Sequence, residues 1–182
     1  MNIPSWVALA PVALLSAAAP TPAHATQYLT IGQAQQQLFP SATTFVDRSL
    51  TFTPAQRNSI ANAARVGSPK SQRIYEASGP GGRLGWLFVD QVLGKHELIT
   101  YAVALDPKGA VHGIEILDYR ETYGSEIRNA KWRQQFVGKR NGASLQLDGD
   151  IKNISGATLS SRHVTDGVRR LLATFALLFP RA

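Results

Sequence analysis

Four strand-like runs joined by short turns limit the fold more than any other feature of the sequence. The runs cover residues 72–77, 84–93, 98–105 and 110–117. Gly-Pro-Gly-Gly, Gly-Lys and Asp-Pro-Lys-Gly lie between them and suit tight reversals of the chain. Strands joined by such short connections pair antiparallel, because a parallel pair needs a crossover of a dozen or more residues. We therefore predict an α+β fold with an antiparallel β-meander, rather than a doubly wound parallel sheet.

Helical patterns lie on both sides of the meander. Residues 30–38 carry apolar side chains at helical spacing, and Thr53-Pro54 opens a second helix that stops at Gly67. These two helices are similar to a docking element, but nothing in them suggests chemistry, and we expect them to serve structural packing. A C-terminal helix is predicted from Ser160 or Ser161 onward, because its apolar residues fall on one face: Val164, Val168, Leu171 and Leu172.

The first 25 residues predict export. They contain no charged side chain, their apolar run extends from Trp6 to Ala19, and Ala23-His24-Ala25 has the small-residue pattern of a signal-peptidase site. We predict a signal peptide over residues 1–25 and a periplasmic location for the rest. Retention of this segment as a membrane anchor stays open, although the run is shorter than the ~20 residues of a membrane span.

Composition excludes several classes of site. The chain has no cysteine, so disulfides, thiolate metal sites and cysteine-ligated iron–sulfur clusters are excluded. The histidines are too scattered to predict a metal site. The net charge is +7, but an exported protein does not meet genomic DNA, so we expect no nucleic-acid partner. Within the basic stretch 128–140, Trp132 and Phe136 are four residues apart and predict one buried helix stripe.

The stretch from Asp150 to Leu172 is the most informative about function. Its small residues let backbone amides approach an oxygen-rich ligand, and the helix that follows directs its positive dipole end at the same place. Such a loop suits a phosphate group. The alternative is an ordinary helix start with Thr158 or Ser160 as the N-cap residue.

Two motifs resemble the FMN-binding domain family. Ser155-Gly156-Ala157-Thr158-Leu159-Ser160 is similar to its attachment motif, and Arg120-Glu121-Thr122-Tyr123-Gly124-Ser125-Glu126 is similar to its Glu-Thr-Pro-Gly turn. The family includes the flavin-carrying periplasmic subunits of the Rnf and sodium-translocating NADH:quinone reductase complexes. Tyr123 replaces the proline of the turn, and Lys152 stands where many relatives have aspartate.

The resemblance implies a cofactor and a division of the chain. A flavin transferase would join the phosphate of FMN to the Thr158 hydroxyl as a phosphoester. The predicted cofactor-binding residues are the whole attachment motif and three residues of the turn motif: Ser155, Gly156, Ala157, Thr158, Leu159, Ser160, Glu121, Thr122 and Gly124. The division is a signal peptide (1–25), an N-terminal helical segment (26–70) and an FMN-binding domain (71–182).

Two functions follow from these residues. The first is an exported electron carrier, rather than a stand-alone enzyme, that relays electrons between membrane redox proteins. Part of the positive charge then balances the flavin phosphate or steers an acidic partner. The second is a non-redox exported module that holds a phosphorylated ligand, or FMN reversibly, at the same loop.

Overall fold

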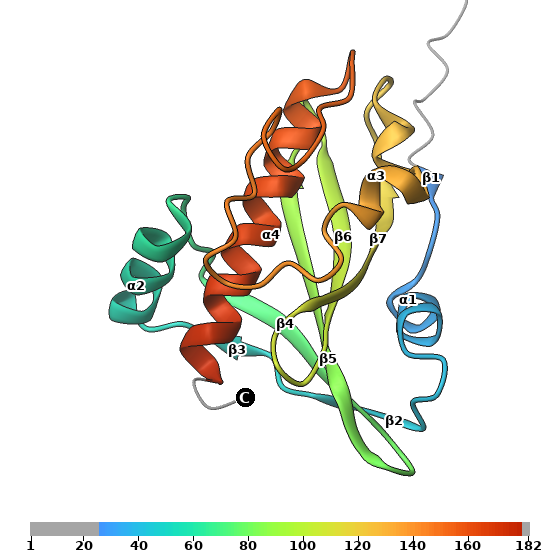
Figure 1. Cartoon of the computed structure of the whole chain (residues 1–182), viewed down its shortest axis with the longest axis vertical. Coiled ribbons are helices and arrows are strands. Elements are labelled where there is room, and N and C mark those ends of the chain that lie inside the picture. The colour runs from blue at the N-terminus through green and yellow to red at the C-terminus, as the bar shows by residue number, and fades with distance from the viewer. Residues whose placement is uncertain (1–25, 180–182) are drawn as a thin grey trace, which may run out of the picture.

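A computed structural model describes residues 26–179, so the predicted signal peptide lies outside the described residues. One antiparallel sheet runs through the molecule in the order β1-β7-β6-β5-β4-β2, and β3 pairs with β4 beside β2 (Figure 1). The strands are β1 (Thr26–Gln27), β2 (Thr44–Asp47), β3 (Leu50–Thr51), β4 (Ser71–Gly79), β5 (Gly82–Leu93), β6 (Leu98–Leu105) and β7 (Val111–Tyr119).

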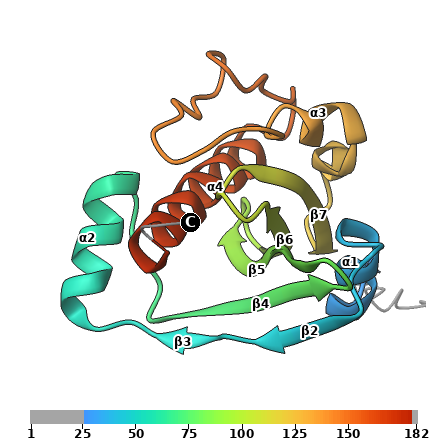
Figure 2. The same cartoon turned by 60° about the horizontal axis from the view of Figure 1, so that its bottom comes forward.

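The predicted meander is confirmed as strands β4 to β7, each paired antiparallel with the next. The predicted α+β class is confirmed as well, since helices cover both faces of this sheet (Figure 2). The segment before the meander holds more than helices, because β1 pairs with β7 while β2 and β3 pair with β4. These strands are two to four residues long, too short to show a period of two in the sequence.

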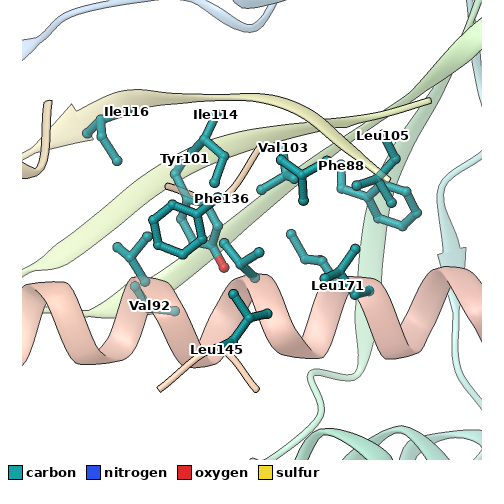
Figure 3. Close-up of a cluster of buried hydrophobic side chains, with 14 of the residues drawn as sticks. Phe88, Val92, Tyr101, Val103, Leu105, Ile114, Ile116, Phe136, Leu145 and Leu171 are labelled. Carbon is teal, nitrogen blue, oxygen red and sulfur yellow. The ribbon is translucent and has the colours of Figure 1, made fainter. Parts of the chain in front are cut away.

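The long C-terminal helix α4 (Thr158–Leu178) covers one face of the sheet (Figures 1 and 2). Alternate residues of the strands point toward it and form the main core, part of which is drawn in Figure 3. Trp132 and Phe136 are both buried in this core as predicted, with their rings 5.1 Å apart, but Phe136 lies in the turn after the helix rather than on one helix stripe. Trp132 belongs to the short helix α3 (Ala130–Gln134), which follows a 3-10 turn, η1 (Ser125–Arg128).

Helix α1 (Ile31–Leu38) packs on the opposite face. Its Ala34 and Leu38 contact the other set of alternating side chains, which includes Leu87, Ala102 and Leu117. Strands β5 and β6 are therefore buried on both faces, which explains why their sequences are almost continuously apolar. Thr30 is the N-cap of α1: its hydroxyl accepts from the Gln33 amide, and its own amide donates to the Gln33 side chain.

Helix α2 (Pro54–Ala64) begins as predicted, with Thr53 as N-cap, but the prediction that it stops at Gly67 is wrong. It ends at Ala64, and Arg65 takes the left-handed conformation that glycine usually supplies at a helix end. The Ala64 carbonyl accepts a hydrogen bond of 2.7 Å from Arg169 Nε of α4. A contact with a residue 105 positions away therefore replaces the local stop signal.

A buried polar group joins α4 to the centre of the sheet. Tyr101 Oη donates to Asp90 Oδ2 at 2.8 Å, and the Asp90 carboxylate also pairs with Arg170 Nη2 at 2.5 Å. The Tyr101 hydroxyl points at the helix in Figure 3, and it fits there because residue 167 is glycine. None of the helices within residues 26–179 is long and apolar enough to cross a membrane.

Candidate functional site

A cavity of about 460 Å³ lies at the end of the sheet where β7 and the β5–β6 hairpin meet the start of α4. Such a volume is within the ~300–1,000 Å³ of typical small-molecule sites. Three separate segments of the chain line it. The lining residues are Lys95, His96, Glu121, Thr122, Tyr123, Gly156, Ala157, Thr158, Leu159 and Ser160.

The start of α4 presents backbone amides to this cavity. Ala157 is the N-cap residue, and within the described residues no side chain caps the helix there. The amide of Ser161 is the first with a helical acceptor, the Ala157 carbonyl at 2.9 Å. The amides of Thr158, Leu159 and Ser160 precede it and have no intrahelical acceptor. The alternative that Thr158 or Ser160 is an ordinary N-cap is therefore wrong, and this helix start has the donors that bind an anion.

The loop before α4 fixes the position of Thr158. Trp132 Nε1 donates to the Lys152 carbonyl, and the Lys152 amide donates to Gln135 Oε1, each at 2.8 Å. Asn153 Nδ2 then donates to Thr158 Oγ1 at 3.2 Å. Gly156 has a φ of +81°, and a side chain there would meet no described atom within 4 Å, so its backbone is open to a ligand.

Glu121 connects the second motif to the β5–β6 turn. Its Oε1 accepts from the amides of His96 and Glu97 at 2.5 and 3.0 Å. Burial opposes ionisation of this carboxyl group, but the amide hydrogen bonds outweigh burial and leave its pKa below the usual value. Glu121 is therefore ionised at neutral pH, and it holds Lys95 and His96 at the cavity wall.

Tyr119, the last residue of β7, joins the two motifs. Its hydroxyl donates to the Tyr123 carbonyl and lies 3.2 Å from Ser160 Oγ. A phenol has one proton, so the Ser160 hydroxyl is the donor to Tyr119 and its lone pairs stay available as acceptors. Gly124 lies against this junction: a Cβ atom there would be 2.5 Å from Tyr119 Oη and 2.7 Å from the Ala157 Cβ.

The structure brings together most of the residues predicted from the two motifs, although they are more than 30 positions apart in the sequence. Glu121, Thr122 and residues 156–160 line the cavity. Ser155 is exposed beside the lining residues, and Gly124 is buried behind them as a packing contact. Lys95, His96 and Asn153 were not among the predicted residues, because only the folded hairpin and loop place them here. Tyr123 was not among them either, although it belongs to the turn motif and lines the cavity.

Several basic side chains of the stretch 128–140 form ion pairs with acidic residues of the same protein. Arg133 pairs with Glu115, Lys139 with Asp150 at 2.7 Å, and Arg140 with Asp106 at 3.7 Å. The Asp150 carboxylate also accepts from the amides of residues 145 and 146. Asp150 is the acid nearest to the attachment motif, and its contacts show that it organises the preceding loop.

Comparisons with known proteins concern the family match and the fold. The model of the FMN-binding domain family matches residues 94–173, which include both motifs. A crystal structure of Shewanella oneidensis NqrC is similar to this chain, with a TM-score of 0.55 and 15% sequence identity. The similarity covers 80% of this chain and 86% of that one, and it shows a shared fold. No curated protein matches the sequence.

Proposed function

We propose that the protein is an exported electron-transfer flavoprotein of the FMN-binding domain family that carries FMN on the Thr158 hydroxyl. The match of residues 94–173 to the family model supports this. One observation supports the proposal most strongly. Thr158 is the first residue of α4, so its hydroxyl lies beside backbone amides that have no intrahelical acceptor, inside a cavity that both family motifs line.

The residues present fit the chemical groups of FMN. The phosphodiester formed on Thr158 Oγ1 would lie at the helix N-terminus, where amide donors and the helix dipole favour its negative charge. The open backbone at Gly156 leaves room for phosphate oxygens. Ser160 Oγ offers an acceptor to the hydroxyl groups of a ribityl chain.

The rest of the cavity suits a flat aromatic ring. Tyr123 and Leu159 both line the cavity, and they are 81% and 42% exposed, which is unusual for large apolar side chains. A bound ring would cover part of this apolar surface. FMN supplies the group that accepts and releases electrons. The protein contributes the charges around the ring, because ionised Glu121 and Lys95 of the β5–β6 turn both line the cavity.

Location and partners complete the proposal. The signal-peptide pattern of residues 1–25 supports export to the periplasm. A flavin transferase would attach the cofactor, and membrane redox proteins would donate and accept the electrons. The cavity is open to solvent on the side of Tyr123 and Leu159, so a partner can approach the ring there without unfolding the domain.

Denaturing electrophoresis tests the proposed attachment. The protein is produced with a flavin transferase and its export signal, and the gel is viewed by flavin fluorescence before staining. We expect a fluorescent band for the wild type and for Thr51→Ala, an exposed threonine of β3, and none for Thr158→Ala. FMN that binds the native protein but is lost on denaturation would support the alternative, a module that binds FMN reversibly.

A further inference from the structure

Asn153 makes a side-chain contact with the proposed attachment atom. Its Nδ2 donates to Thr158 Oγ1 at 3.2 Å, and its Oδ1 accepts from the Ile154 amide at 2.8 Å. The second bond fixes the plane of the carboxamide, so the first is directed at the hydroxyl oxygen. The residue is part-buried, which strengthens such a hydrogen bond relative to one in bulk water.

The loop holds this carboxamide firmly in place. Lys152, the preceding residue, is tied to α3 through both of its backbone groups, to Trp132 and to Gln135. On the other side, the Ala157 amide donates to the Ile154 carbonyl at 3.0 Å and closes the turn that leads into α4. Asn153 therefore has little freedom to move independently of the helix start.

We propose that Asn153 is a positioning residue for modification of Thr158, an inference that rests on the proposed function. A threonine hydroxyl has one proton and two lone pairs. The Asn153 amide occupies one lone pair and fixes the side-chain torsion, which leaves the other lone pair to attack phosphorus and the proton free to depart.

The step that Asn153 assists is a phosphoryl transfer. Thr158 Oγ1 forms a bond to the phosphorus of an activated flavin phosphate, and the bond from that phosphorus to its leaving phosphate ester breaks. The hydroxyl proton passes to solvent or to the transferase, so the protein gains FMN less one water. In the product Thr158 Oγ1 would be an ester oxygen of the phosphate, and the Asn153 amide that donates to this atom would help to hold the phosphoester.

The test measures the rate at which purified transferase and its flavin donor load the full exported protein, followed by intact-mass spectrometry. A neutral hydrogen bond contributes enough to make the expected loss for Asn153→Ala roughly 2- to 10-fold in rate. Asn153→Asp should load more slowly still, because a carboxylate cannot donate and repels the phosphate. Asn141→Ala, at an exposed asparagine away from the cavity, should load like the wild type.

A second background separates positioning from a general loss of structure. The Cγ2 methyl of threonine restricts the torsion of Thr158, and serine lacks it. Asn153→Ala should therefore slow FMN loading more in the Thr158→Ser protein than in the wild type. It should change the thermal unfolding midpoint of both proteins by the same amount. If the wild type gains FMN at Thr158 and Asn153→Ala gains it at the same rate, the inference is overturned. A wild type that gains no FMN at Thr158 would instead overturn the proposed function.

Discussion

Replacing Gly124 by alanine tests how the two motifs are held together. Gly124 has a φ of +93°, in the left-handed region that L-residues avoid. A Cβ atom there would be 2.5 Å from Tyr119 Oη and 2.7 Å from the Ala157 Cβ. Neither neighbour can move freely, because Tyr119 donates to the Tyr123 carbonyl and Ala157 is the N-cap of α4.

The expected loss has two parts. The left-handed conformation costs an alanine about 1–2 kcal/mol. Overpacking against a fixed neighbour typically costs a further ~1–3 kcal/mol. Gly124→Ala should therefore lower the free energy of unfolding by about 2–5 kcal/mol. It should also push the Glu121 turn away from α4, which would reduce FMN loading of the protein that remains folded.

Gly142→Ala is a matched control. Gly142 has a φ of +91°, but a Cβ atom there would meet none of the described atoms within 4 Å. It should pay the conformational cost alone, about 1–2 kcal/mol, and load FMN normally. Urea denaturation gives the stabilities and intact mass gives the loading. Equal losses of stability in the two variants, or normal loading of Gly124→Ala, would refute the idea that close contact at Gly124 joins the motifs.

Three further changes probe other parts of the molecule. Gly167→Ala would place a methyl group against the buried Tyr101 hydroxyl, so urea denaturation should show a free energy of unfolding lower by roughly 2–4 kcal/mol. Gly32→Ala, in open space on α1, should leave the free energy of unfolding unchanged or raise it slightly. Glu121→Gln should raise the reduction potential of the bound flavin by an amount on the order of tens of millivolts in a redox titration, because it removes a negative charge that disfavours the reduced, more anionic flavin. An unchanged potential would mean that Glu121 only holds the turn. Burial opposes ionisation of Asp150, but Lys139 and the loop amides lower its pKa below 3.8, so the ionised carboxylate stabilises the fold above that pH and this stabilisation is lost as the pH falls further. The difference in unfolding free energy between wild type and Asp150→Asn should therefore shrink in acid. A difference that stays constant from pH 6 to pH 3 would contradict this.

The sequence predicted the meander well because its signals are local. Turn residues at Asp106-Pro107-Lys108-Gly109 and the apolar runs of β5 and β6 agree with each other, and β6 has the predicted bounds. The end of α2 and strands β1 to β3 depend instead on contacts with distant segments. Arg169 reaches the end of α2 from α4, and no pattern within residues 54–67 indicates this contact.

In the site, too, the parts with a local sequence signal were predicted, and the parts that depend on contacts between distant segments were not. Family resemblance identified the two motifs, but the hairpin turn with Lys95 and His96 carries no motif of its own. It joins the cavity because the Glu121 carboxylate binds its backbone amides, and backbone amides have no sequence signature. Likewise, an N-cap role for Thr158 or Ser160 is the usual expectation for hydroxyl residues before a helix. The structure instead starts α4 at Thr158 and ties Ser160 to Tyr119.

The most direct test of the central claim is tandem mass spectrometry of peptides from the exported protein, produced with a flavin transferase. We expect the peptide that contains residues 155–160 to carry one FMN less one water, with the fragment ions placing the addition on Thr158. Thr158→Ala should yield the same peptide unmodified. An unmodified Thr158 in wild-type protein, or an addition placed on Ser155 or Ser160, would contradict the account.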